Sequence, residues 1–108
     1  MKRNNMKTKL PYYAVIFTST QTENIEGYSE MAEKMENLAK EQKGYIGIES
    51  ARNTVGITVS YWKSLEAIKA WKANTEHLFA QQKGREQWYN SYNVRICKVE
   101  REYEFETD

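Results

Sequence analysis

The chain has 108 residues, of which 40% are hydrophobic and 13% aromatic, so a single domain with a packed core is expected. Its formal net charge of +1 argues against a nucleic-acid partner, and no apolar run approaches the roughly 20 residues that a membrane span needs. The single cysteine, Cys97, excludes an intramolecular disulfide and fits a reducing, cytoplasmic compartment.

The N-terminal segment, MKRNNMKTKL, is basic, and no apolar stretch follows it. We therefore interpret residues 1–10 as a flexible, solvated tail and not as a signal peptide. Pro11 marks the boundary with the single domain expected at 11–106. The next segment, YYAVIFTST at 12–20, is β-branched and aromatic with apolar residues on both faces, which predicts a strand covered on both sides.

From Asn24 onwards, apolar residues recur at helical spacing as far as Ala39, with charged residues on the opposite side. This pattern predicts an amphipathic helix packed on a sheet, with Asn24 as its N-cap and Gly44 as its stop. Two β-rich segments follow at 45–52 and 55–62. The short polar break between them predicts a hairpin.

Ser64 is expected to cap a short helix, SLEAIKAWKA, which a bend near Asn74 separates from a second helical piece over 75–91. The last strand is expected over 93–105, and its alternating end predicts contact with a partner subunit. The order is therefore β-α-β-β-α-β, the ferredoxin-like pattern of an α+β domain, with the second helix split.

The segment 77–92, placed at helical steps, gives one face that mixes aromatic and polar residues. That face holds His77, Gln81, Arg85, Trp88 and Tyr92. Burying histidine, glutamine and arginine without partners costs several kcal/mol. Either a solvated or ligand-filled cleft or a closed hydrogen-bond network removes that cost, and the sequence leaves both open.

The motifs of metal and cofactor sites do not occur in the sequence. His77 and Cys97 are the only residues of their kinds and stand twenty positions apart, which is not a metal-ligand spacing. No glycine-rich phosphate loop or dinucleotide fingerprint occurs. We therefore expect neither a metal nor a cofactor.

Several motifs resemble one known family. The strand GYIGIES, the segment ITVSYWKSLEAIKAW and the downstream EHLFAQQKGREQWY are together similar to the antibiotic biosynthesis monooxygenase (ABM) domain, over about residues 12–105. The resemblance implies a homodimeric α/β barrel, in which each subunit holds a small hydrophobic or aromatic molecule between its helices and its sheet. Members of the family include cofactor-independent oxygenases of aromatic substrates and haem-degrading enzymes, so the resemblance implies these as candidate activities for this chain.

The haem-degrading branch of the family has an iron-ligating histidine ten residues after a helix tryptophan. Trp71 matches that tryptophan, and Gln81 then stands at the ligand position. An amide is a poor iron ligand beside imidazole. Haem degradation is therefore the third alternative for this chain, after the two considered below.

The oxygenases of aromatic polyketides are matched at only one residue. Trp62 corresponds to their substrate-contacting tryptophan, whereas Thr58 stands where they have asparagine and Ile68 where they have tyrosine. The arginine of their following helix falls nearest to Gln82, with Arg85 one turn later. The resemblance therefore supports oxygenation at the family level only.

Two hypotheses for function follow. The first is a cofactor-independent monooxygenase of a small aromatic or polycyclic substrate, with His77 as general base. Its substrate would contact Trp62, Trp88 and Tyr92, and also Trp71 and Thr58, while Arg85 or Gln81 holds the developing oxyanion. The alternative is a non-catalytic, homodimeric module that binds a small molecule or has a stress-related role.

Overall fold

The computed structural model describes residues 8–82 and 85–107, apart from the side chains of residues 79–86. Its elements are β1 (Tyr12–Gln21), α1 (Tyr28–Lys40), β2 (Tyr45–Arg52), β3 (Gly56–Trp62), α2 (Leu65–Gln82), α3 (Arg85–Trp88) and β4 (Tyr89–Val99). The predicted β-α-β-β-α-β order is confirmed, with the short α3 added between α2 and β4. Of the predicted tail, residues 1–7 lie outside the described residues.

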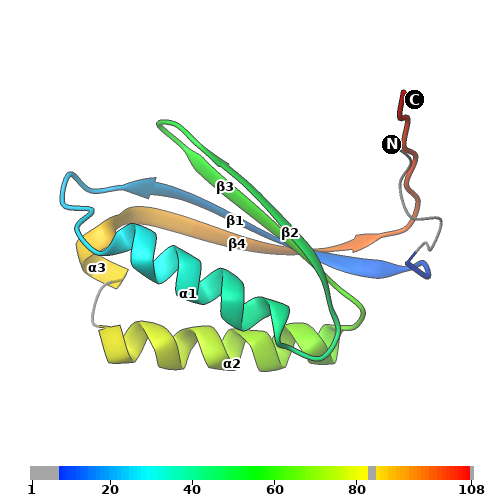
Figure 1. Cartoon of the computed structure of the whole chain (residues 1–108), viewed down its shortest axis with the longest axis horizontal. Coiled ribbons are helices and arrows are strands. Elements are labelled where there is room, and N and C mark those ends of the chain that lie inside the picture. Colours follow the sequence, from blue (N-terminus) through cyan, green and yellow to red (C-terminus); the bar gives the residue numbers. More distant parts are fainter. Residues whose placement is uncertain (1–7, 83–84, 108) are drawn as a thin grey trace.

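The four strands form one antiparallel sheet in the order β2-β3-β1-β4, which is the ferredoxin-like arrangement. Both long helices lie on the same face of this sheet (Figure 1). Tyr13 of β1 pairs with Trp62 of β3, and paired residues project to the same face. Trp62 packs against both helices, so the odd-numbered residues of β1, including Val15 and Phe17, face the helices as well.

The core lies between the helices and the middle of the sheet, around Trp62, whose exposed fraction is 0%. The Trp62 ring stacks on Trp71 of α2, with 5.5 Å between the centroids, and Ala39 of α1 and Ile68 complete the cluster. The indole Nε1 of Trp62 donates to Ser60 Oγ over 2.9 Å, so its only polar atom has a partner.

The predicted start of the first helix is wrong by several residues. The helix α1 begins at Tyr28, after Gly27, which has a φ of 84° that favours glycine. Asn24 does not cap the helix, because its Oδ1 accepts a hydrogen bond from Glu26 N in the preceding turn, over 3.4 Å. The helix ends at Lys40, and Gly44 (φ 88°) forms the turn into β2.

The predicted cap at Ser64 is confirmed, because its Oγ accepts from Ala67 N over 3.1 Å. The predicted bend at Asn74 is wrong, since α2 runs unbroken through this residue. No proline or glycine interrupts α2, so nothing in its backbone forces a kink. The Asn74 side chain instead donates to Gln42 Oε1 over 2.9 Å and joins α2 to the loop after α1.

The predicted helix over 75–91 is also wrong at its end. The helix α2 ends at Gln82, and the chain pairs with β1 from Tyr89 onwards, opposite Gln21. Helical propensity at this point is overridden by sheet pairing.

The final strand is shorter than predicted. β4 ends at Val99, opposite Tyr12, the first residue of β1, so no further β1 residue is there to pair with it. Residues 100–107 have no regular structure and turn away from the helices at one end of the sheet (Figure 1). Tyr103 and Phe105 are 81% and 88% exposed within this segment. None of the described helices is long and apolar enough to span a membrane.

Candidate ligand cavity

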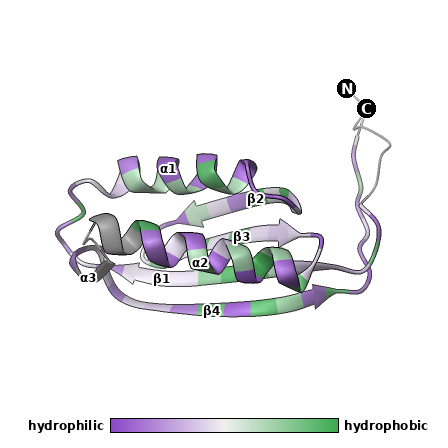
Figure 2. Ribbon diagram, turned by 90° about the horizontal axis from the view of Figure 1, so that it is seen from below, coloured by the Kyte–Doolittle hydropathy of each residue, from purple (hydrophilic) through white to green (hydrophobic). Residues whose placement is uncertain are grey.

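A cavity of about 690 Å³ lies between the sheet and the two long helices, and we call it the helix–sheet cavity. Its lining is mainly apolar and aromatic, and includes Val15, Phe17, Tyr28, Met31, Ala32, Met35, Ile48, Arg52, Thr58, Trp71, Tyr89, Tyr92, Val94 and Ile96. Figure 2 shows α1 beside β2 and α2 over the middle strands, whereas β4 lies at the margin of the sheet. Val94 and Ile96 of β4 are 49% and 53% exposed, so the cavity opens along this strand.

One end of the helix–sheet cavity is built from aromatic rings, and we call Phe17, Tyr28, Tyr89 and Tyr92 the aromatic end. Phe17 stacks on Tyr92, with 5.2 Å between centroids, and meets Tyr89 edge-on at 5.5 Å. Tyr28 of α1 meets Tyr89 edge-on at 5.9 Å. Burial, followed by the hydrogen bond with Tyr28, raises the pKa of Tyr89 well above its ordinary value, so this phenol is neutral at physiological pH.

Arg52 enters the aromatic end from the last position of β2. The register places Arg52, Gly56 and Ser19 in one row across three strands. Because Gly56 has no side chain, the guanidinium lies directly over it, and a Cβ there would overlap the guanidinium. Arg52 Nη2 donates to Ser19 Oγ, which is buried, and the guanidinium carbon lies 5.7 Å from the centre of the Tyr28 ring.

The structure places three of the predicted site residues in the cavity lining. These are Thr58 of β3, Trp71 of α2 and Tyr92 of β4. Trp62 lies in the core beneath Trp71 and is not among the lining residues. Trp88 is buried against the loop before α1, where its Nε1 donates to the carbonyl oxygen of Glu26 over 2.8 Å, so its indole is held by packing outside the lining.

The predicted single face of His77, Gln81, Arg85, Trp88 and Tyr92 is wrong, because these residues belong to three different elements. His77 is on the exposed side of α2 and is not among the residues that line the cavity. The side chains of Gln81 and Arg85 lie outside the described part of the structure. Their predicted roles, and that of His77, stay predictions.

Sequence reasoning missed Arg52, Tyr28 and Tyr89 as site residues. Arg52 is an arginine at an inward-facing position of a strand, and a glycine four residues later allows it to cross the neighbouring strand. The spacing of Arg52 and Gly56 is visible in the sequence. The direction of the Arg52 side chain is not, because only the pairing of β2, β3 and β1 brings Ser19 within its reach.

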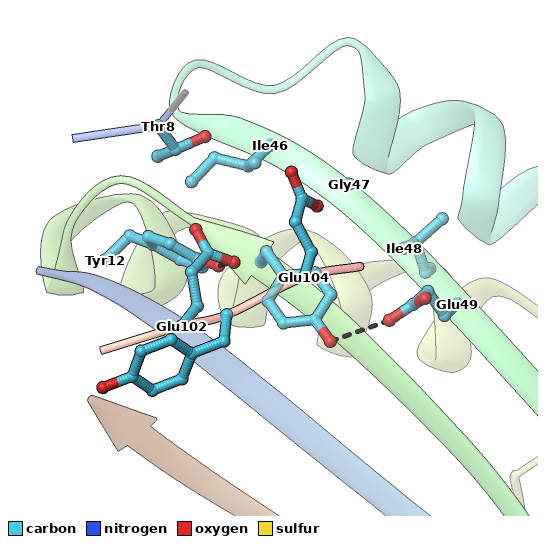
Figure 3. A pocket seen from close by; sticks show the side chains of 10 residues that line it. Thr8, Tyr12, Ile46, Gly47, Ile48, Glu49, Glu102 and Glu104 are labelled. Carbon is cyan, nitrogen blue, oxygen red and sulfur yellow. Dashed lines mark hydrogen bonds between the residues drawn. The ribbon is translucent and has the colours of Figure 1, made fainter. Parts of the chain in front are cut away.

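A second hollow, of about 600 Å³, lies where the C-terminal segment passes β2 and β3, and we call it the acidic pocket. It is lined by Thr8, Tyr12, Ile46, Gly47, Ile48, Glu49, Tyr61, Glu102, Tyr103 and Glu104. Figure 3 shows Tyr12, Glu49, Glu102 and Glu104 in the lining of this pocket. Tyr12 donates to Glu102 and Tyr61 donates to Glu49, each over 2.8 Å. Among the described residues, no group of three acidic, histidine or cysteine side chains is arranged to hold a metal ion.

Two tyrosines of the acidic pocket, Tyr12 and Tyr61, are expected to ionise at a higher pH than an ordinary tyrosine. Burial, followed by the hydrogen bond to Glu102, raises the pKa of Tyr12 from 10.0 to about 12. Burial, followed by the hydrogen bond to Glu49, does the same for Tyr61. The folded state therefore keeps two protons that the unfolded chain has lost above pH 10, so this contribution to stability is complete below pH 10 and is lost as pH rises through about 12.

Tyrosinate absorbance measured against pH tests this expectation. We expect Glu102→Gln to shift the ionisation of Tyr12 toward pH 10, because the variant removes the carboxylate that repels the phenolate. A Tyr12→Phe variant assigns the signal. Ionisation of all eight tyrosines near pH 10 in the folded protein would contradict the geometry of this pocket.

Comparisons with known proteins agree with the fold. The sequence profile of the antibiotic biosynthesis monooxygenase (ABM) family matches residues 11–83. The uncharacterised protein YqjZ of Bacillus subtilis strain 168 is 53% identical over 98 residues, covering 89% of this chain and 86% of the relative. The chain is a member of the ABM family, which confirms the resemblance noted from the sequence.

Solved structures share the fold at low sequence identity. SnoaB, a cofactor-independent oxygenase from Streptomyces nogalater, superposes with a TM-score of 0.70 and 7% identity, over 85% of this chain and 96% of SnoaB. PA3566 from Pseudomonas aeruginosa superposes with a TM-score of 0.65 and 17% identity, over 86% of this chain and 96% of PA3566. At these identities the likeness establishes the ferredoxin-like architecture, and the residues of the site must be argued from this chain alone.

Proposed function

We propose that this protein is a cofactor-independent monooxygenase that acts on a small aromatic or polycyclic substrate in the helix–sheet cavity. The observation that carries this proposal is the lining of the cavity, which combines stacked aromatic rings with Met31 and Met35 of α1. A volume of about 690 Å³ lies within the range of small-molecule sites. Membership of the ABM family supports oxygenation as the reaction class.

The proposed reaction needs a substrate that can be its own source of electrons. An activated ring CH₂ group, as in an anthrone, loses a proton and becomes a carbanion-like species that can reduce O₂. One oxygen atom forms the new carbonyl and the other leaves as water, so that CH₂ and O₂ become C=O and H₂O. In this scheme the protein binds the ring, excludes bulk water from its faces and stabilises the negative charge.

The source of the base is a separate question. His77 is the predicted base, but it is exposed on α2 and does not line the cavity. The proposal therefore rests on the cavity, and His77 is tested independently of it. Loss of oxygen uptake in His77→Ala, with unchanged substrate binding, would assign the base role to this residue.

Oxygen consumption tests the proposed function directly. The purified protein is mixed with a panel of hydroquinones and anthrones, and oxygen uptake is followed beside heat-denatured protein. Sustained uptake above the spontaneous rate, with one oxygen atom of ¹⁸O₂ recovered in the product, is the expected result. Uptake equal to that of the denatured control across the panel would refute the proposal.

A non-catalytic binding module is the second candidate, and one observation favours it. The chain's only histidine is not among the residues that line the cavity, so no imidazole is placed there to accept a proton. Saturable binding of an aromatic compound without protein-dependent oxygen uptake would select this candidate over the monooxygenase.

We also propose that the protein is a homodimer in the cytoplasm. Tyr103 and Phe105 of the C-terminal segment are 81% and 88% exposed. Covering these groups in a second copy of the chain would remove apolar surface from water. The free thiol of Cys97 is compatible with a reducing compartment.

Sedimentation equilibrium tests the dimer. We expect twice the chain mass for the wild type and a weaker self-association for the Tyr103→Ser, Phe105→Ser double variant, because it removes two exposed aromatic rings. A Leu65→Ser variant, which changes an exposed apolar residue of α2, serves as the control. A wild-type protein that sediments as a monomer at all concentrations would contradict the proposal.

A further inference from the structure

Arg52 is a cation at the aromatic end of the cavity, and its contacts among the described residues are with neutral groups. Its guanidinium donates to the Ser19 hydroxyl and lies over the Tyr28 ring. Within the described part of the chain, the ion pairs do not include Arg52. Arg52 is exposed to solvent, and an arginine held in place without a carboxylate partner is available to bind an anion from outside the chain.

The position of Arg52 is fixed from two sides. Ser19, 2% exposed, accepts one of its N–H groups from below, and Gly56 leaves the space through which the side chain crosses β3. A guanidinium has five N–H donors in a rigid fork, so the bond to Ser19 leaves others for a ligand. Fixing the side chain before binding reduces the rotamer entropy that is lost when an anion binds.

We propose that the helix–sheet cavity takes an aromatic ligand that carries an anionic oxygen, a carboxylate or a phenolate, and that Arg52 binds this oxygen while the ring lies against Phe17 and Tyr92. This proposal rests on the proposed function for placing the ligand in the cavity. It adds the charge of the ligand and the residue that selects it, neither of which follows from membership of the family.

The surroundings of Arg52 favour an anion over a neutral ring. Tyr89 lines the same end, and its raised pKa keeps its phenol neutral, so it does not repel an anion bound at Arg52. The carboxylates in the lining, Glu36 and Glu76, belong to α1 and α2 and not to the row of Arg52. Glu36 also pairs with Lys40 at 3.3 Å, which offsets its charge.

Two matched pairs of probes test the charge of the ligand. The carboxylate pair is 2-naphthoate and the neutral 2-naphthamide, and the phenolate pair is 2,4-dinitrophenolate and the neutral 2,4-dinitroanisole. Each pair keeps its ring and changes its charge. Dissociation constants are measured by calorimetry under argon, so that turnover does not enter the result.

Three variants test the role of Arg52. Arg52→Gln removes the charge, Arg52→Lys keeps the charge without the planar fork, and Gly56→Ala keeps arginine but displaces its guanidinium. Lys34→Gln removes the same charge from the exposed side of α1 and is the control. Circular dichroism is used to check that each variant is folded. If Arg52→Gln does not fold, Arg52→Lys still tests the role of Arg52.

For wild type we expect the anions to bind more tightly than their neutral partners. Arg52→Gln should weaken anion binding by roughly 10- to 100-fold, since a hydrogen bond to a charged group is lost. Gly56→Ala should give a loss of the same direction, Arg52→Lys an intermediate one, and Lys34→Gln none. Preference for one anionic pair identifies carboxylate or phenolate as the ligand group.

Several outcomes would overturn the proposal. These are equal weakening of the neutral and the anionic probes in Arg52→Gln, an equal effect of Lys34→Gln, and no binding of any of the four probes. Failure of the proposed function looks different, because it appears as absent oxygen uptake with an intact preference for anions that depends on Arg52. Conversely, oxygen uptake that is unchanged in Arg52→Gln, without any charge preference, would refute only the inference made here.

Discussion

Trp62→Ala is expected to lower the free energy of unfolding by about 3–5 kcal/mol, the range for truncating a buried tryptophan. The ring is fully buried, stacks on Trp71 and meets Tyr45 edge-on at 5.8 Å. Truncation therefore removes contacts from both helices and from β2, and leaves Ser60 Oγ without its indole donor. Because domains of this size are stable by about 5–15 kcal/mol, the variant should lie close to the limit of folding.

Urea denaturation followed by circular dichroism measures this loss. Trp62→Phe keeps an aromatic ring in the core and should lose less than Trp62→Ala. Leu65→Ala, at a half-exposed position of α2, should stay within about 0.5 kcal/mol of wild type. A loss below about 1 kcal/mol for Trp62→Ala would show that this ring is not at the centre of the core.

Ala32→Trp is expected to abolish binding in the helix–sheet cavity while the protein stays folded. Ala32 lines the cavity from α1, and its side chain is exposed to solvent through it, so a larger group projects into free space and not into the core. An indole there would occupy much of the volume a bicyclic ligand needs. We expect binding of 2-naphthoate and any oxygen uptake to fall by at least about tenfold.

The control for steric blocking places the same side chain elsewhere on the helix. Lys34→Trp adds an indole at an exposed position of α1 that is not among the residues lining the cavity. Calorimetry with 2-naphthoate should give wild-type affinity for Lys34→Trp. Wild-type affinity for Ala32→Trp as well would mean that the ligand binds outside the helix–sheet cavity, and the proposed site would have to be abandoned.

The elements of the fold were readable from local pattern. The β-branched segment at 12–20, the hairpin at 45–62 and the cap at Ser64 all appear in the structure within a residue or two. Their signals are local, because alternation, turn residues and capping need only neighbours in sequence. The order of these elements was enough to predict the ferredoxin-like architecture.

The candidate site was not readable in the same way. The helical projection grouped His77 with Trp88 and Tyr92 on one face, but Tyr89 and its neighbours pair with β1 and end the helical region. Pairing of distant strands thus decided the boundary that local spacing placed wrongly. Of the predicted residues, Thr58, Trp71 and Tyr92 line the cavity, while Trp62 became core.

The sequence by itself determined the family and the order of the elements. Only the tertiary structure decided which residues meet at the cavity, because Arg52, Gly56 and Ser19 come together solely through the register of three strands. Alternation along a strand fixes which face a side chain takes, but not the residue opposite it. That second choice depends on pairing between segments more than thirty residues apart, and it places an arginine beside the aromatic rings.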